Sequence, residues 1–238
     1  MSDSFSACLL VSHGSRDPRP QAAIDQLAMR LSQRSPHPIG TAALELAPLP
    51  LNQQIQEFAK SAFAAGYCRV NVLPLFLLSG VHVTQDIPAE VAIAQQFLHP
   101  DMVLELRPHL GSHPHLGTLL MNLIGSIATP ATGKVLIAHG SRCLDSHQPV
   151  EALAERLGAI PAYWSVPPSL ESQVMKLVQS GYAKIAILPY FLFEGGITDA
   201  IAQTVAHLTD HAPQTYLHLA KPIGVTPELT DLVLDLMA

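Results

Sequence analysis

Two short stretches decide the fold: LLVSHGSR at residues 9–16 and LIAHGSR at residues 136–142. In each, a short apolar run typical of a buried strand ends on a histidine and continues into Gly-Ser-Arg. His13 and His139 lie 126 positions apart (139 − 13). This repetition predicts that one structural unit occurs twice in the chain.

Further along the chain, a second and longer match supports the duplication. GYCRVNVLPLFL at residues 66–77 returns as GYAKIAILPYFL at residues 181–192, and residues 48–55 weakly match residues 167–174. We therefore expect two tandem copies, residues 1–126 and 134–238, joined near the segment SIATPATG at residues 126–133.

Each copy alternates short apolar runs with longer amphipathic stretches, the pattern of βαβ units that build a parallel sheet. The predicted strands are residues 8–11, 41–46, 70–76 and 102–106, then 135–138, 162–166, 185–191 and 215–219. The predicted helices are residues 21–31, 51–65, 88–98 and 116–127, then 147–157, 170–179, 198–208 and 227–237. The expected fold class is α/β, with two similar lobes that are each a parallel sheet flanked by helices. Thr226 is the expected N-cap of the last helix.

Composition excludes several classes of protein. The 238 residues are 48% apolar and 13% charged, and a net charge of −6 with scattered cations argues against a nucleic-acid partner. No apolar run approaches a membrane span, and the first residues lack a secretory signal, so we expect a cytoplasmic protein with no membrane partner. Cys8, Cys68 and Cys143 are expected to be reduced thiols in the core.

Three polar residues are expected at the ends of predicted strands, where open α/β sheets bind ligands. They are His13, Glu45 and His82. Two imidazoles and a carboxylate suit an open site for a divalent transition metal such as iron, cobalt, nickel or zinc. A lone histidine after a strand is more often solvated or a cap. Glu45 lies within an apolar string, where a carboxylate requires a partner, a cation or a cavity.

Neighbouring polar residues have two interpretations each. Ser15 is expected to cap the following helix, whose first N–H groups could also bind an anion. Arg16 and Arg142 are either surface charges or ligands for carboxylates. The tract with His109, His113 and His115 resembles a metal-binding segment, but its glycine and proline, Gly111 and Pro114, favour a loop. The chain has neither a GxSxG nucleophile elbow nor the arginine that precedes the histidine in phosphohistidine enzymes.

Taken together, SHGSR at residues 12–16, ALELA at 43–47 and LPLFLLSGVHVTQDIP at 73–88 resemble the sirohydrochlorin chelatases, the CbiX/SirB group of class II tetrapyrrole chelatases. The resemblance implies a lyase that inserts Fe²⁺ for sirohaem or Co²⁺ for cobalamin into sirohydrochlorin, without ATP. Two pyrrole protons are released. It implies His13, Glu45 and His82 as metal ligands and catalytic groups, with the metal as substrate and no permanently bound cofactor.

The second copy departs from this pattern. It keeps His139, but Trp164 aligns with Glu45 and Glu194-Gly195-Gly196-Ile197 answers Ser79-Gly80-Val81-His82. We therefore expect a single metal site, in the first copy.

By the resemblance, sirohydrochlorin carries eight carboxylates, so a chain of negative charge needs local cations to bind it. The predicted substrate-binding residues are Ser15, Arg16, His139 and Arg142. Because an internal duplication can replace a dimer, we expect a monomer. A carrier of tetrapyrrole or metal, and a chelatase of another tetrapyrrole, remain the alternative functions.

Overall fold

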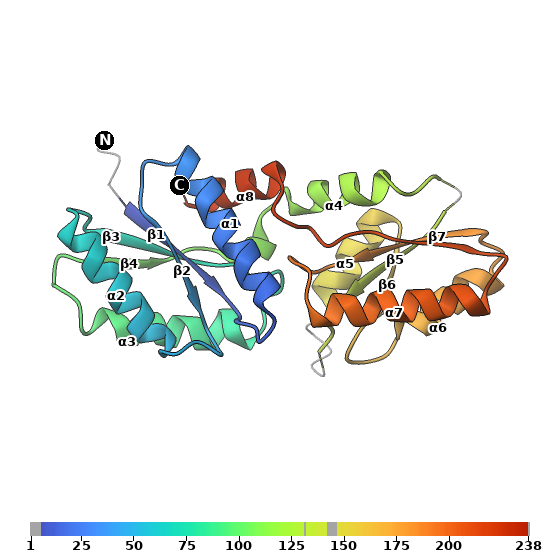
Figure 1. Cartoon of the computed structure of the whole chain (residues 1–238), viewed down its shortest axis with the longest axis horizontal. Helices are drawn as coiled ribbons and strands as arrows, with labels where there is room; N and C mark the ends of the chain where they lie inside the picture. The colour runs from blue at the N-terminus through green and yellow to red at the C-terminus, as the bar shows by residue number, and fades with distance from the viewer. Residues whose placement is uncertain (1–5, 131, 142–146, 238) are drawn as a thin grey trace. The chain divides into compact units, whose positions relative to one another are not determined.

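The computed structural model describes residues 6–130, 132–141 and 147–237. The chain divides into two compact units. Unit 1 runs to His113 and resumes at Val225, and unit 2 is Pro114–Gly224 (Figure 1). No helix in the described part of the chain has the length and apolarity that a membrane crossing requires.

Unit 1 is built on a parallel sheet of four strands in the order β2-β1-β3-β4. The strands are β1 Ser6–Ser12, β2 Ile39–Ala43, β3 Arg69–Pro74 and β4 Val103–Leu106. The connecting segments are α1 Pro18–Arg34, α2 Leu51–Ala64, the π-helical turn η1 His82–Asp86, α3 Ile87–Gln95 and the 3₁₀ turn η2 Leu110–Ser112. Parallel strands need such crossovers, which confirms the predicted βαβ pattern.

Unit 2 repeats this plan with the strand order β6-β5-β7-β8. Its strands are β5 Gly133–Ala138, β6 Ile160–Tyr163, β7 Lys184–Pro189 and β8 Tyr216–Leu219. Its helices are α4 Leu116–Gly125, α5 Gln148–Leu157, α6 Leu170–Gln179 and α7 Gly196–His211. The predicted fold class, two lobes with a parallel sheet flanked by helices, is confirmed.

The hydrophobic core is built in the same way in both units, between the sheet and the same pair of helices. In unit 1, alternate residues of β1 such as Leu9 and Val11 pack with apolar residues of α2 and α3. In unit 2, Val135 and Ile137 of β5 pack in the same way with α6 and α7. The central strands are buried on both faces, as expected for parallel sheets with helices on each side.

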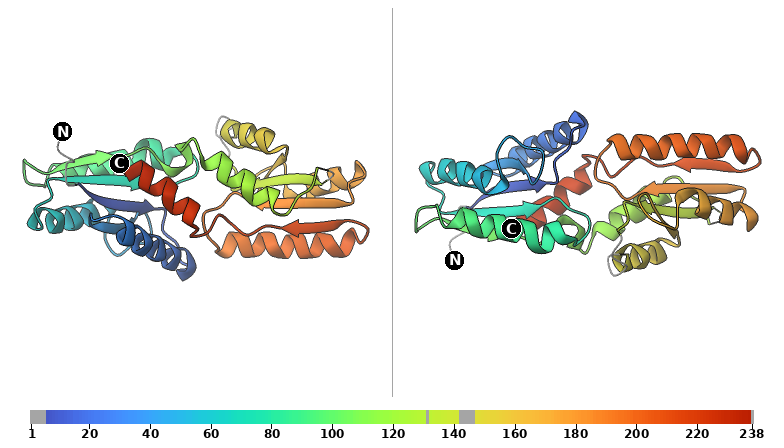
Figure 2. Two further views of the ribbon diagram at one scale, coloured as in Figure 1. Left: turned by 90° about the horizontal axis from the view of Figure 1, so that it is seen from above. Right: turned by 90° about the horizontal axis from the view of Figure 1, so that it is seen from below.

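The last helix of each copy joins the other copy's sheet. Helix α4 follows β4 in the sequence but packs on α5 and β7 of unit 2. Helix α8, Pro227–Met237, follows β8 but packs on α1 and β3 of unit 1, and Figures 1 and 2 show it in red among the elements of that unit. The compact units therefore do not coincide with the repeats at residues 1–126 and 134–238.

Several local expectations need correction. The strand that precedes Glu45 ends at Ala43, so Glu45 lies in the following loop. The helix predicted over residues 88–98 is α3, Ile87–Gln95, and a π-helical turn that the periodicity did not predict precedes it. Cys68 is exposed whereas Cys8 is buried, and Cys143 lies outside the described residues. Thr226 does cap α8, since its hydroxyl accepts the N–H of Leu229 at 3.1 Å.

Candidate metal centre

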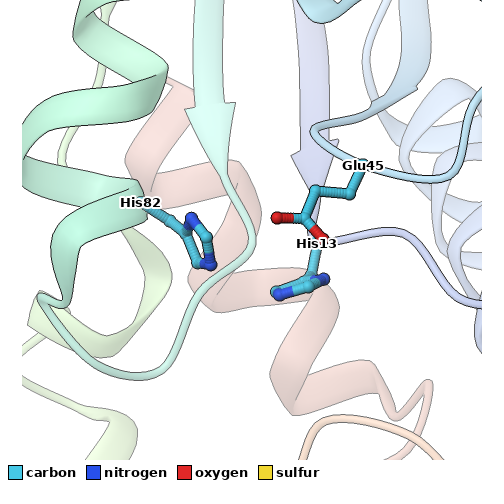
Figure 3. Close-up of side chains that lie close together, drawn as sticks. All are labelled: His13, Glu45 and His82. Atoms are coloured by element: carbon cyan, nitrogen blue, oxygen red, sulfur yellow. The ribbon is translucent and has the colours of Figure 1, made fainter.

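Three loops of unit 1 bring His13, Glu45 and His82 together (Figure 3). His13 directly follows β1, Glu45 lies just after β2, and His82 begins η1 after β3. One ligand atom from each residue lies within 4.8 Å of the others, and no second group of this kind occurs among the described residues. His13 and Glu45 are exposed and His82 is partly buried, so the site is open to solvent.

Backbone hydrogen bonds continue the β1–β2 pairing into the site. The N–H of Glu45 donates to the carbonyl of His13 at 2.9 Å, which fixes two of the three residues side by side. Gly14 has φ +95°, and a Cβ there would lie 2.0 Å from the carbonyl oxygen of Glu45. Only glycine allows both this conformation and this close approach.

The two imidazole rings meet edge to face. Their centroids are 4.9 Å apart with an interplanar angle of 90°. The Phe76 ring lies 6.2 Å from His13 and 6.1 Å from His82, so an aromatic side chain flanks both rings. The Nδ1 atom of His82 also lies 2.7 Å from a carboxylate oxygen of Asp86.

Asp86 was missed as a candidate in the sequence. The signal that could have found it is its position four residues after His82 within the motif that carries the resemblance. A carboxylate on the distal nitrogen of a ligating histidine is a common feature of metal sites.

Exposed apolar side chains adjoin the three residues of the candidate metal site. Leu46 follows Glu45 and is 58% exposed, and Val81 precedes His82 and is 59% exposed. Leu46 also has φ +59°, and no other non-glycine residue of the described ranges has positive φ. Such strain in a leucine tends to occur at functional sites.

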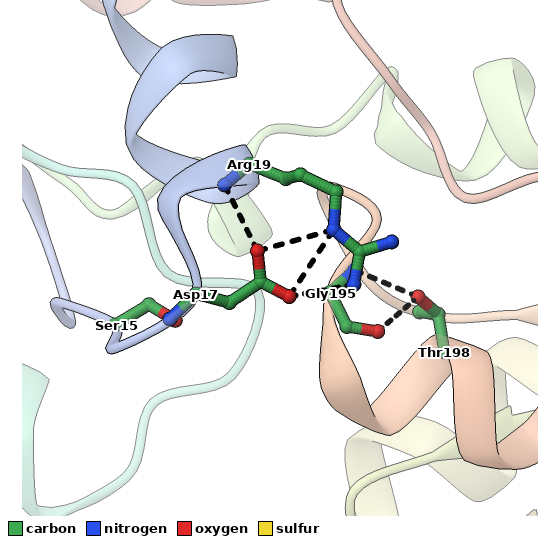
Figure 4. Close-up of polar contacts among 5 residues, drawn as sticks. All are labelled: Ser15, Asp17, Arg19, Gly195 and Thr198. Carbon is green, nitrogen blue, oxygen red and sulfur yellow. Dashed lines mark hydrogen bonds and ion pairs between the residues drawn. The ribbon is translucent and has the colours of Figure 1, made fainter.

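The loop after His13 differs from expectation. Asp17, not Ser15, is the N-cap of α1: its carboxylate accepts the backbone N–H of Arg19 and pairs with that residue's guanidinium at 2.6 Å (Figure 4). These contacts, chiefly the side-chain hydrogen bond from Arg19, lower the pKa of Asp17 from 3.8 to about 2. The hydroxyl of Ser15 accepts the N–H of Asp17 at 3.0 Å, and Arg16 is exposed. The start of α1 is thus already capped by an anion of the chain itself.

The equivalent loops of unit 2 show what the second copy has lost. There the N–H of Ser165 donates to the carbonyl of His139 at 2.9 Å, just as Glu45 bonds to His13. These equivalent hydrogen bonds make Ser165 the counterpart of Glu45. Sequence matching aligns Trp164 with Glu45, and that alignment is wrong by one residue. His139 is exposed, and its Nδ1 lies 3.0 Å from the carbonyl of Gly140. Arg142 lies outside the described residues.

The tract at residues 109–115 is not part of the three-residue group. His113 is buried and lies 3.6 Å from the Asp235 carboxylate, while desolvation lowers the pKa of His109. A Cβ on Gly111 would lie 1.9 Å from the carbonyl of Leu77, so this glycine allows close packing of the loop. These contacts support the loop interpretation.

Comparisons with known proteins agree with the duplication. The family model CbiX matches the chain twice, over residues 7–126 and 133–238. A sirohydrochlorin ferrochelatase of Bacillus subtilis is 26% identical over 241 residues, covering 96% of this chain and 89% of the relative. A sirohydrochlorin cobaltochelatase of Priestia megaterium is 26% identical over 240 residues, covering 94% of this chain and 76% of the relative.

A solved structure also matches the fold over almost the whole chain. The structure described as SirB from Bacillus subtilis with Fe3+ superposes with a TM-score of 0.77 at 24% identity, covering 97% of this chain and 93% of that chain. At that level of identity the likeness concerns the fold alone.

Proposed function

The chain belongs to the CbiX family, and on that premise we propose that it is a chelatase that inserts Fe²⁺ or Co²⁺ into sirohydrochlorin. The observation that carries this proposal is the open cluster of His13, Glu45 and His82, whose ligand atoms lie within 4.8 Å of one another. Two full-length relatives are named as chelatases of sirohydrochlorin, one for iron and one for cobalt. The metal ion is a substrate of this reaction.

The donor set fits transient binding of a divalent metal. Imidazole and carboxylate ligands suit first-row transition metals. Three ligands at a solvent-exposed edge leave coordination positions open, whereas four protein ligands would form a closed structural site. A metal held in this way can pass to the four nitrogens of a macrocycle.

Metal insertion also requires a base. The free macrocycle loses two pyrrole protons as the divalent ion binds, so the products are the metallated ring and two protons. We assign His13 and His82 as metal ligands that can also accept a pyrrole proton, because neutral imidazole does both near neutral pH. Glu45 is the third ligand or a proton relay.

Side chains around the ligands suit a flat ring with a charged edge. Leu46 and Val81 offer apolar contacts for the face of a macrocycle next to the metal ligands. Arg16 offers a cation for peripheral carboxylates, and Ser15 a polar contact in the same loop. We assign His139 and Arg142 of the second copy the same role of substrate contact.

Absorbance spectroscopy of sirohydrochlorin with the purified protein and Co²⁺, or Fe²⁺ without oxygen, tests the proposal. We expect a rate above the spontaneous reaction, lost in His13→Ala and His82→Ala and kept in His207→Ala, an exposed histidine of α7. Binding of metal or tetrapyrrole without a rate would identify a carrier instead. Turnover of a different tetrapyrrole in preference to sirohydrochlorin would identify another chelatase.

A competition assay with Fe²⁺, Co²⁺ and Ni²⁺ identifies the preferred metal, since these ligands accept all three. We further propose that the protein acts in the cytoplasm as a monomer with no permanently bound cofactor. Light scattering coupled to size exclusion, with metal analysis of the purified protein, tests the last two statements.

A further inference from the structure

The segment after the third strand is one residue longer in the first copy than in the second. In each copy a threonine hydroxyl donates to the carbonyl of a preceding glycine: Thr84 to Gly80 at 3.1 Å, and Thr198 to Gly195 at 2.8 Å (Figure 4). The threonine is four residues from its glycine in the first copy and three in the second, so the offset between the copies changes from 115 at the glycines to 114 at the threonines.

Burial on either side of this segment gives the same result. The buried strand ends Pro74 and Pro189 are 115 positions apart, whereas the buried helix positions that follow, Ile87 and Ile201, are 114 apart. Val91 and Val205 continue the spacing of 114. One added residue between the strand and the helix accounts for this change.

The extra residue changes the local helix. In the second copy α7 is α-helical from Gly196 onward. In the first copy η1 is a π-helical turn, and the N–H of Ile87 donates to the carbonyl of His82 five residues earlier. Single π-helical turns inside helices occur frequently at functional sites. Here the turn starts on a member of the metal cluster.

Asp86 ends the same turn and supports His82. Its carboxylate lies 2.7 Å from Nδ1 of the imidazole, so Nε2 is the nitrogen that remains for a metal ion. Such a hydrogen bond fixes the tautomer and the orientation of a ligating ring. The second copy, without the extra residue, has neither the histidine nor the aspartate, since Ile197 and Ala200 precede Ile201 at those places.

We propose that the π-helical turn His82–Asp86 is the positioning device of the metal site. The extra residue aims the imidazole of His82 at His13 and Glu45, and Asp86, a positioning residue, holds the ring through Nδ1. The inference rests on the proposed function in that the bound ion is the metal substrate of the chelatase.

Deletion of Val83 tests the role of the extra residue. The product Gly80-Val81-His82-Thr84 has the length of Gly195-Gly196-Ile197-Thr198, which folds as a regular helix start in unit 2. We expect Co²⁺ affinity, measured by titration calorimetry on the full chain, to fall at least about tenfold. The control Val83→Ala keeps the residue count and should bind within about twofold of the wild type. Equal affinity of the deletion and the control would overturn the proposal.

Substitution of Asp86 tests the support of His82 without changing the chain length. Asp86→Ala should weaken Co²⁺ binding by about 10- to 100-fold, and the neighbouring exposed residue provides the control Gln85→Ala. Nitrogen-15 spectra of the metal-free protein should show the Nδ1-protonated tautomer of His82 in the wild type and its loss in Asp86→Ala. Asp86→Glu should restore part of the Co²⁺ affinity and part of the signal of the Nδ1-protonated tautomer. Wild-type affinity with an unchanged tautomer in Asp86→Ala would contradict the positioning role.

These measurements separate the two proposals. If the wild type binds Co²⁺ and the deletion does not, the positioning device stands even when sirohydrochlorin is not turned over, and only the proposed function fails. If the wild type binds no Co²⁺, the positioning device is refuted directly.

Discussion

Gly14 shows how one residue can hold two proposed metal ligands, His13 and Glu45, in register. Its positive φ allows the chain to turn after His13, and its missing side chain admits the carbonyl of Glu45. The hydrogen bond from the N–H of Glu45 to the carbonyl of His13 places both residues at the same edge of the sheet. The SHGSR motif therefore provides a proposed metal ligand, His13, and also the glycine that the backbone needs at the next position.

Gly14→Ala should lower the free energy of unfolding by at least about 2 kcal/mol, because left-handed strain adds to a backbone clash. Gly66→Ala is the matched control: Gly66 has φ +90° but nothing within 4 Å of a Cβ. We expect the control to cost only about 1 kcal/mol and to keep Co²⁺ affinity. Urea denaturation measures the free energy of unfolding of the two variants, and titration calorimetry measures their Co²⁺ affinity. Equal losses of stability in Gly14→Ala and Gly66→Ala would refute the backbone clash at Gly14.

Leu46 carries strain beside the site. Its counterpart by register, Val166, has no positive φ, so the strain occurs in the copy that has the candidate metal cluster. Replacing Leu46 by glycine removes strain of about 1 to 2 kcal/mol and adds a glycine entropy cost of about 0.5 to 1 kcal/mol. We therefore expect unchanged or higher stability for Leu46→Gly, together with a raised KM for sirohydrochlorin.

The control for Leu46 is Leu49→Gly, in the same loop but without positive φ. It should lose about 0.5 to 1 kcal/mol of stability. Thermal and urea unfolding of the two variants provide the comparison. If Leu46→Gly lost as much stability as Leu49→Gly, the strain at Leu46 would be disproved.

At the scale of elements, the end of α8 is held by polar groups of unit 1. Asn71, buried on β3, donates to the carbonyl of Met237 at 2.8 Å, and Arg107 donates to that of Leu236 at 2.9 Å. Arg107 also pairs with Glu105, whose pKa is lowered by hydrogen bonds from Arg69 and Arg107. Donors at the last carbonyls of a helix satisfy groups that have no partner within the helix.

Asn71→Ala should lower the free energy of unfolding by about 1 to 2 kcal/mol, because a buried carbonyl loses its donor. Hydrogen exchange should accelerate first in α8. The exposed residue of α4 gives the control Asn122→Ala, which should change stability by no more than about 0.5 kcal/mol. Protection of α8 equal to that of the wild type would contradict the anchoring role.

The elements were largely predictable because each has a periodic apolar pattern. All eight helices and eight strands of the prediction occur, with shifts at their ends. The π-helical turn His82–Asp86 was not predictable, because the buried positions 87, 91 and 94 of α3, which follows it, have ordinary helical spacing. It is identified by the hydrogen bond from the N–H of Ile87 to the carbonyl of His82, five residues earlier.

For the whole molecule, only the first copy has all three of the proposed metal ligands. Unit 2 retains His139 but has Ser165 and Ile197 at the places of Glu45 and His82. We expect titration calorimetry to show that the wild type binds one Co²⁺ per chain. The variant His139→Ala should bind the same number of ions with the same affinity. Two bound ions, with one lost in His139→Ala, would show a second site.

The sequence by itself determined the α/β class and the duplication, because repeats and apolar periodicity are local properties of the chain. It also predicted the three residues of the proposed metal site and indicated that the second copy lacks two of them. Only the tertiary structure decided that α4 and α8 pack on the sheets of the opposite copies, that Ser165 faces His139, and that Asp86 supports His82. The first two depend on hydrogen bonds and packing between residues distant in sequence. The third depends on a π-helical turn that the apolar spacing of α3 does not reveal.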